Sequence, residues 1–284
     1  MNQDNLNKMI NEALAIESES AKEAGTLGFM ARALVQATMP HKKHLGSEFS
    51  RHNGLFTLSI LSPAETGIPY GSIPRLLLAW LTTEAVRTKE KQIILGDSLS
   101  NFMRKLDIVP TGGRWGTIGR LRDQMQRLFA SSVKCIYNNN EAWLVKSIDM
   151  IDEASLWWYP KNPNQVTIFE STLTLSERFF NEIINNPIPI DMRALQALSK
   201  SPLALDIYCW LTYRMSYLKK NTCIPWEVLE LQFGADYKLT RQFRSAFLKQ
   251  LRSVQLVYPE SRVENSEKGL IIKPSSPHIA LSCA

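Results

Sequence analysis

Residues that bind metals or form disulfides are scarce in this sequence. Its 284 residues include four cysteines and four histidines. The cysteines have no CxxC pair, so we expect reduced thiols in a reducing compartment; they are Cys135, Cys209, Cys223 and Cys283. The histidines lack the His-hydrophobe-His arrangement that holds the metal of a DNA-nicking enzyme; they are His41, His44, His52 and His278. We therefore expect no metal site and no nuclease.

Signals for nucleotide chemistry and for membranes are also missing. No GxxxxGK[ST] motif occurs, and the TGG segment at residues 111–113 is too short to hold a triphosphate. No apolar run approaches the roughly eighteen residues of a membrane span, and no leader peptide opens the chain. The sequence therefore predicts a cytoplasmic protein that is not an enzyme and needs no cofactor.

The charge is unevenly distributed along the chain. The net charge is +6, but residues 1–24 hold five acidic side chains against two lysines, so the remaining 260 residues carry +9. A basic excess of this kind favours a polyanion as partner. Residues 5–24 have apolar side chains at helical spacing. We expect an acidic amphipathic helix there, either a loosely attached arm or a partner-binding element.

Residues 96–129 have the pattern helix, turn, helix. Asp97 and Ser98 are typical of a helix start, and apolar residues at helical spacing follow from Leu99 to Leu106. A proline and paired glycines between residues 108 and 113 end this helix. The second helix is amphipathic and rich in arginine and glutamine, which contact phosphates and base edges in a major groove. We interpret it as a DNA-recognition helix.

The predicted DNA contacts around this helix include one lysine from the strand that follows it. They are Arg114, Arg120, Arg122, Gln124, Arg127 and Lys134. Basic residues on an amphipathic helix are often only a solvated face. The nucleic-acid interpretation therefore depends on the repeat described below.

Two strands joined by an Asn-rich turn are predicted next, at residues 132–137 and 142–148. Helix, turn, helix and a hairpin is the element order of a winged-helix domain. A strand at 165–172 and a helix at 176–184 complete this half, and the prolines and asparagines of residues 185–189 indicate a boundary. We predict an N-terminal helical arm (1–45), a first winged-helix domain (46–184) and a second (185–284).

The second half of the sequence repeats the first. At an offset of 130 residues, the WLT segment at 80–82 matches WLT at 210–212. After the turn the offset falls to 122, where Arg122 matches Arg244. Loops absorb such length changes and packed helices do not. The predicted fold is α+β, mainly helical, with two tandem winged-helix domains of similar topology.

Basic and amide residues also surround the apolar stripe of the second recognition helix, predicted at residues 239–251. The predicted contacts are Lys238, Arg241, Gln242, Arg244, Lys249 and Arg252. Two such helices can contact successive major grooves, so we expect an asymmetric double-stranded DNA site of about two turns. We assign base selection to Arg120, Arg241 and Arg244, each worth roughly 1–3 kcal/mol if bidentate to guanine.

Residues 67–129 carry a resemblance to a known family. The segments GIPYG (67–71), PRLLLAWL (74–81), EAVRT (84–88), TGG (111–113) and RLF (127–129) resemble the signature of plasmid replication initiators of the RepA type. The close similarity covers about a quarter of the chain. Contacts assigned to the second recognition helix depend on the internal repeat more than on this resemblance.

The resemblance implies a plasmid replication initiator that binds repeated origin sequences (iterons) through two winged-helix domains and so takes part in copy control. It implies origin opening without covalent chemistry, homodimers held by the first domain, and the host initiator and replicative helicase as partners. A winged-helix transcriptional repressor, with or without autoregulation, would use the same helices and is the alternative. A purely structural or protein-binding role is the third possibility.

Overall fold

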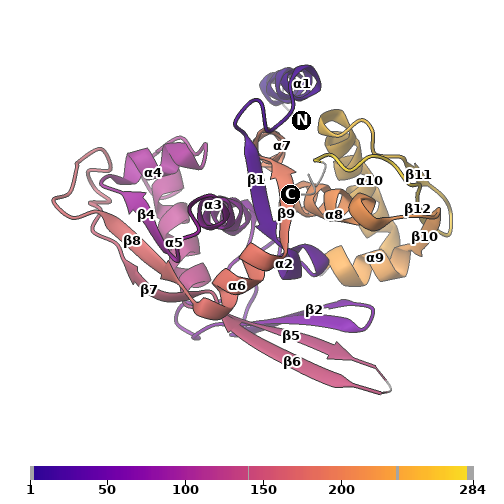
Figure 1. Cartoon of the computed structure of the whole chain (residues 1–284), viewed down its shortest axis with the longest axis horizontal. Coiled ribbons are helices and arrows are strands. Elements are labelled where there is room, and N and C mark those ends of the chain that lie inside the picture. Colours follow the sequence, from indigo (N-terminus) through magenta and orange to yellow (C-terminus); the bar gives the residue numbers. More distant parts are fainter. Residues whose placement is uncertain (1–2, 140, 235–236, 280–284) are drawn as a thin grey trace.

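The computed structural model describes residues 3–139, 141–234 and 237–279. These residues form ten helices and twelve strands, and the strands lie in four antiparallel sheets (Figure 1). The α+β class is confirmed. The expectation of a mainly helical chain is wrong, because helices hold only 41% of the residues. None of the described helices is long and apolar enough to cross a membrane.

Two sets of elements follow one another in the same order, and we call them lobe 1 and lobe 2. Each runs strand, short helix, long helix, strand, two helices and two strands. Lobe 1 contains β1 (Leu27–Ala31), α2 (Arg32–Gln36), α3 (Ser72–Thr88), β4 (Gln92–Gly96), α4 (Leu99–Lys105), α5 (Thr117–Phe129), β7 (Ile151–Ser155) and β8 (Ser171–Leu175). Lobe 2 contains β9 (Pro187–Asp191), α7 (Met192–Leu198), α8 (Pro202–Tyr217), β10 (Thr222–Pro225), α9 (Trp226–Phe233), α10 (Thr240–Val257), β11 (Val263–Asn265) and β12 (Gly269–Ile272).

The sheets of the two lobes match as well as the element order does. In lobe 1 the strand order is β4-β8-β7, and in lobe 2 it is β10-β12-β11. In both, the strand before the two helices pairs with the last strand of the lobe. The internal repeat inferred from the sequence therefore extends to the pairing of the strands.

An approximate two-fold axis passes through the β1–β9 pair. These strands are antiparallel, with Phe29 opposite Pro189 at their centre and Leu27 opposite Asp191 at one end. Because the pairing is antiparallel and centred on the middle residues, a half-turn relates the equivalent first strands of the two lobes. In Figure 1 the equivalent helices α3 and α8, and α4 and α9, lie on opposite sides of this strand pair.

The segment predicted as an interruption, residues 185–189, contains the end of α6 and the first three residues of β9. Proline is tolerated there because alternate residues of an antiparallel pair point their N–H groups away from the partner strand. Phe29, opposite Pro189, donates its N–H to Thr83 Oγ1 at 2.9 Å, and Asp191 donates its own to the Tyr208 hydroxyl at 2.8 Å. These positions therefore need no hydrogen bond within the sheet.

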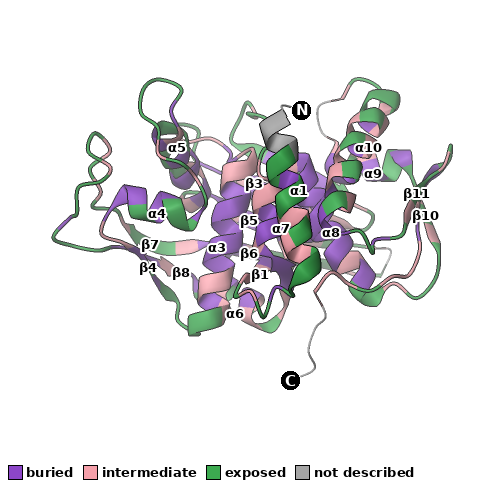
Figure 2. Cartoon of the chain, turned by 90° about the horizontal axis from the view of Figure 1, so that it is seen from above, coloured by how far each residue is buried: buried purple, intermediate pink, exposed green. Residues whose placement is uncertain are grey.

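The N-terminal helix α1 (Gln3–Ser18) packs against α7 and α10 of lobe 2. Met9 is buried, and the Arg193 guanidinium donates to the carbonyl oxygens of Ala15 and Glu19 at 3.0 and 2.9 Å. Lys8 reaches across to Asp107 of lobe 1, with its Nζ 3.0 Å from Oδ2. Figure 2 shows α1 between α5 and α10. These contacts exclude the loosely attached arm from the two alternatives.

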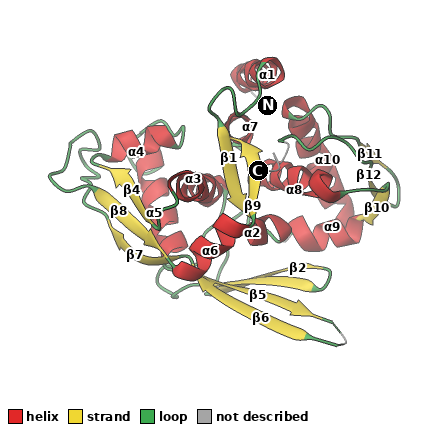
Figure 3. Ribbon diagram, in the orientation of Figure 1, coloured by secondary structure: helices red, strands yellow, loops and turns green. Residues whose placement is uncertain are grey.

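Four strands form a separate sheet of order β2-β3-β5-β6 (Figure 3). They are β2 (Glu48–Asn53), β3 (Phe56–Leu61), β5 (Ser132–Asn138) and β6 (Trp143–Asp149). The hairpin predicted at 132–148 is present as β5 and β6, but its placement in the lobe 1 sheet is wrong, because β5 pairs with β3. The strand pair equivalent to β11–β12 is β7–β8, whose connecting loop spans residues 156–170.

Sequence distance explains this error. A hairpin with a short turn is visible in sequence, whereas β7 and β8 are separated by a long loop, and the strand predicted at 165–172 begins only at Ser171. The helix predicted at 176–184 is confirmed as α6 (Glu177–Asn185). β1 and α2 fall within residues 1–45, predicted as an arm, yet β1 pairs with β9 in the body of the molecule.

Equivalent aromatic contacts lie in the cores of the two lobes. Trp80 on α3 meets Phe102 of α4 edge to face, with ring centroids 5.2 Å apart. Trp210 on α8 meets Phe233 of α9 in the same way at 5.3 Å. Both tryptophans are buried. The repeated WLT segment therefore marks the place where the long helix of each lobe packs on the first helix of its helix-turn-helix.

A buried charge cluster joins the long helices of the two lobes. The Arg75 guanidinium of α3 binds both carboxylate oxygens of Asp206 on α8, at 2.6 and 2.7 Å, and His41 Nε2 lies 2.7 Å from the same carboxylate. Burial opposes ionisation of Asp206, but the charge of Arg75 and the hydrogen bonds outweigh it and lower its pKa. Burial lowers the pKa of His41 despite its carboxylate partner.

Candidate nucleic-acid interface

In lobe 1 the helix-turn-helix is formed by α4, a turn at residues 106–116, and α5. Ser98 caps α4 by accepting a hydrogen bond from the Asn101 N–H at 3.3 Å. Asp107 adopts a left-handed conformation (φ 54°) that ends the helix. Thr111 and Thr117 close the turn, since each hydroxyl accepts a hydrogen bond at 2.9 Å from the backbone N–H of the other. The predicted helix, turn and helix are all present.

The two arginines at the middle of α5 face solvent. The buried side of this helix carries Ile118, Leu121 and Met125. Arg120 and Arg122 lie on the exposed side. Both side chains are therefore accessible from solvent, and their assignment as DNA contacts stays a prediction.

Two predicted contacts on α5 have structural partners instead. Gln124 is buried, accepts a hydrogen bond from the Tyr70 N–H at 2.8 Å and donates to Asp123. The structure therefore contradicts its assignment as a DNA contact. Arg127 is half-buried, forms an ion pair with Asp123 at 2.9 Å and lies over the Tyr70 ring. Its principal role here is to hold the segment before α3 against α5.

The remaining two predictions for lobe 1 lie off the helix. Arg114 is exposed in the turn, with its guanidinium 5.2 Å from the ring centroid of Trp115, which is itself 81% exposed. Lys134 lies in β5, between Ser59 of β3 and Ser147 of β6 in the four-stranded sheet. It therefore belongs to a different element from the recognition helix and does not extend that surface.

In lobe 2 the corresponding unit is α9 followed by α10, and residues 235–236 of the turn lie outside the described part of the chain. Phe243, Phe247 and Leu251 face the core. Five of the predicted contacts on α10 or just before it are exposed to solvent. They are Lys238, Arg241, Gln242, Lys249 and Arg252.

Arg244 is less free than these five residues. Its guanidinium lies 5.3 Å from the ring centroid of Trp226 on α9 and donates to Asn265 Oδ1 of β11 at 3.0 Å. It ties α10 to both neighbouring elements of lobe 2. Base selection in lobe 2 is therefore better assigned to Arg241 than to Arg244.

Helices α5 and α10, predicted to contact DNA, lie on one side of the molecule. In Figure 2 both α5 and α10 lie toward the upper edge, on either side of α1. Between them lies the turn that joins α7 to α8, where Ser199 and Lys200 line hollows that reach both helices. The sequence does not single out Lys200, because it comes from a loop distant in sequence from both recognition helices.

Metal-ligating and thiol side chains were also located in the structure. No group of three potential metal-ligating side chains occurs among the residues that the structure describes. Cys135, Cys209 and Cys223 are free thiols, while Cys283 lies outside the described residues. Burial raises the pKa of Cys135 to about 11, so its thiol stays protonated at neutral pH and is a poor nucleophile.

Comparisons with known proteins agree with this geometry. The family model described as "Plasmid encoded RepA protein" matches residues 68–228. The curated proteins contain no match. Two crystal structures of domains 2 and 3 of RctB have a similar fold at 13% identity. For the selenomethionine derivatives the TM-score is 0.53, and the match covers 84% of this chain and 94% of the RctB chain. For the other structure the TM-score is 0.52, and the match covers 85% of this chain and 96% of the RctB chain.

At this identity the two crystal structures show a shared fold and nothing more. The family match carries the assignment, because it spans more than half of the chain and includes the whole helix-turn-helix of lobe 1. The chain thus belongs to the plasmid-encoded RepA protein family.

Proposed function

We propose that this protein initiates plasmid replication by binding repeated origin sequences through its two lobes. The observation that carries the proposal is the pair of equivalent, solvent-facing basic helices, α5 and α10, on one side of the molecule. Membership of the RepA family supports the same function.

Each lobe, in this proposal, is a winged-helix unit. The strand orders β4-β8-β7 and β10-β12-β11 support this, because each places a three-stranded sheet beside a helix-turn-helix. The wings are then the loop between β7 and β8 in lobe 1 and the short turn between β11 and β12 in lobe 2. The β5–β6 hairpin has no part in DNA recognition in this scheme.

The two lobes contact successive major grooves on one face of a duplex. Arginine and lysine side chains neutralise phosphates, so affinity falls steeply as salt rises. Arg120 and Arg241 select bases. Although a half-turn relates the lobes, their exposed residues differ, and a single site therefore has two unlike half-sites.

Origin opening follows from binding and not from catalysis by this chain. The protein acts without enzymatic activity or a cofactor, and the host initiator and the replicative helicase supply the ATP-driven steps. A homodimer held through lobe 1, and control of plasmid copy number by it, belong to the same proposal. The site of action is the plasmid in the bacterial cytoplasm.

Binding of the purified chain to its plasmid origin tests the proposal. We expect hydroxyl-radical footprints of about two helical turns on each of several direct repeats, and affinity that falls steeply with salt. Equal affinity for the origin and for random duplex would contradict it.

A winged-helix transcriptional repressor is the second candidate. The half-turn between the lobes supports it, since dimeric repressors present their recognition helices with the same symmetry. Protection confined to one site at a promoter, with none at origin repeats, would favour this alternative. Protection of both would indicate an initiator that also regulates its own synthesis.

A further inference from the structure

We infer that the α7–α8 turn, with Lys200 at its centre, is a third DNA contact that grips backbone phosphates between the two half-sites. This inference rests on the proposed function. It adds a contact point to the predicted ones, and it concerns the boundary between the lobes instead of either recognition helix.

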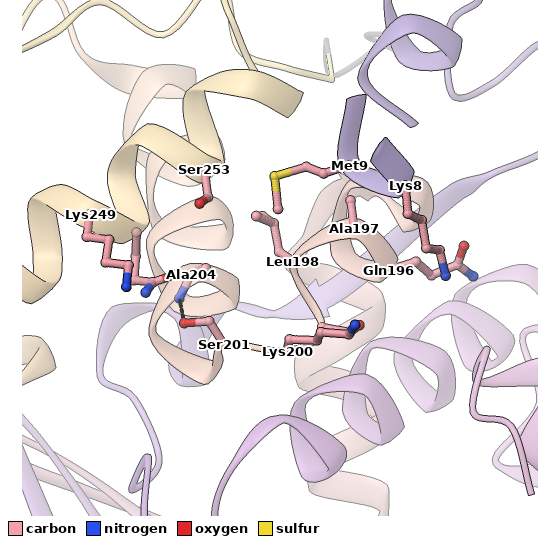
Figure 4. Close-up of a pocket in the computed structure, with 12 residues that line it drawn as sticks. Lys8, Met9, Gln196, Ala197, Leu198, Lys200, Ser201, Ala204, Lys249 and Ser253 are labelled. Atoms are coloured by element: carbon pink, nitrogen blue, oxygen red, sulfur yellow. Dashed lines mark hydrogen bonds between the residues drawn. The ribbon is translucent and has the colours of Figure 1, made fainter. Parts of the chain in front are cut away.

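Two neighbouring hollows connect the recognition helices through this turn. The first, of about 220 Å³, lies between α1, the α7–α8 turn and α10 and reaches Lys249 (Figure 4). The second, of about 620 Å³, lies between the start of α3, the α7–α8 turn and α5 and reaches Arg120. Ser199 and Lys200 line both hollows. The surface between α5 and α10 is therefore concave, with Lys200 at its middle.

The charged side chains that line the two hollows are mostly basic. The lining of the first hollow contains Lys8, Lys200 and Lys249 and no carboxylate. The second contains two carboxylates, and both are already engaged: Asp107 with Lys8 at 3.0 Å, and Asp123 with Arg127 at 2.9 Å.

Three basic side chains at this surface have no acidic side chain as an ion-pair partner among the described residues. Within the described residues, Arg120, Lys200 and Lys249 form no ion pair. Lys200 is exposed, so its ammonium group can reach a ligand that approaches from solvent. The three cations belong to α5, the α7–α8 turn and α10 respectively, and together they form a line from one recognition helix to the other.

Duplex DNA is the polyanion that fits this line. A helix that places successive major grooves on α5 and α10 has its intervening backbone over the α7–α8 turn, and B-DNA carries one negative charge for about every 1.7 Å of its axis. A small anion would be expected in an enclosed site, whereas these cations border open hollows along a continuous surface. Lys200 therefore adds affinity independently of base sequence, since it contacts phosphate.

The test compares Lys200→Gln with Lys220→Gln. Lys220 is also exposed but follows the opposite end of α8, about 24 Å away for a helix of this length. Both exchanges remove one positive charge. For Lys200→Gln we expect the slope of log K against log salt to become shallower by about 0.9 and affinity at 0.15 M salt to fall about fivefold, because one counterion fewer is released. Lys220→Gln should bind as the unaltered chain does.

Footprinting provides the second readout. In Lys200→Gln, protection of the phosphates between the half-sites should be lost while both half-sites stay protected. Thermal unfolding should be unchanged because the side chain is exposed. Titration of the DNA-free protein with ATP and with inorganic phosphate distinguishes a small anion from DNA. Saturable binding of either that needs Lys200 would overturn the assignment to DNA backbone.

The failures can be told apart. If the unaltered chain binds its origin but Lys200→Gln has the same salt slope and the same central protection, the third contact is refuted and the proposed function stands. An equal loss in Lys220→Gln would also refute it, because the effect would then be one of net charge. If the unaltered chain shows no salt-dependent binding to duplex, the proposed function itself fails.

Discussion

At the scale of single residues, burial separates the arginines and glutamines that sequence reasoning had grouped together. Periodicity along α5 shows which positions face the core, but a polar residue at the edge of the apolar stripe can lie on either side. Gln124 is buried because its amide satisfies the Tyr70 N–H, a partner far away in sequence. A buried donor is costly to leave unpaired. The sequence contains no local sign of this partnership.

Arg241 and Arg252 should differ in what their removal does. Arg241 lies in the first turn of α10, where recognition helices contact base edges, and Arg252 lies three turns further on. We expect Arg241→Ala to cost roughly 1–3 kcal/mol at its cognate site and to relax preference at one base pair. Arg252→Ala should weaken binding to all sequences alike. Competition assays with single-base variants measure both, and equal losses on every sequence for Arg241→Ala would contradict a role in base selection.

Two partly buried histidines should make folding stability depend on pH. Burial lowers the pKa of both His41 and His278. Below the ordinary histidine pKa of about 6.5 the unfolded chain then binds protons that the folded chain does not, so the free energy of unfolding falls as pH falls. Urea denaturation between pH 7.5 and 5.5 measures this. His278→Gln should flatten the dependence, whereas the exposed His52→Gln should not; an unchanged profile in His278→Gln would count against the idea.

At the scale of elements, the helices and the repeat could be predicted, but the partners of the strands could not. Apolar spacing predicted α4, α5, α6 and α10, because a helix satisfies its hydrogen bonds locally. A strand makes its backbone hydrogen bonds with another strand, and the local sequence does not show which strand that is. The β5–β6 hairpin was visible, yet its pairing with β3 was not. Pro187 and Pro189 indicated a boundary without regular structure, although a two-stranded ladder can accommodate them.

The contact between each long helix and the helix-turn-helix that follows can be tested through its tryptophan. Trp80→Ala and Trp210→Ala should each lower the free energy of unfolding by roughly 3–5 kcal/mol, because each removes a buried ring packed edge to face on phenylalanine. Trp143, 69% exposed on β6, provides the control. Trp143→Ala should change the value by less than about 0.5 kcal/mol. If Trp80→Ala unfolded at the same urea midpoint as the unaltered chain, this contact would not be needed for stability.

At the scale of the whole molecule, the Arg75–Asp206 pair holds the lobes together. Removing one partner leaves the other buried and uncompensated, so Asp206→Ala should cost roughly 3–5 kcal/mol of stability. The double exchange Arg75→Met with Asp206→Leu removes both charges and should recover part of that loss, since His41 and the backbone carbonyls bound by Arg75 stay unpaired. Chemical denaturation of the single and double variants measures the difference. A double variant as unstable as Asp206→Ala would show that the charges themselves are needed.

The half-turn about the β1–β9 strands also bears on polarity. A protein with two identical halves could bind its DNA site in either of two opposite orientations. The proteins that act after it could then not tell one end of the site from the other. Here the two helix-turn-helix units share one element order, although lobe 1 also carries the four-stranded sheet. Direction is left to the few exposed side chains by which α5 and α10 differ, and exchanging those sets between the helices should reverse the way the molecule faces on its origin.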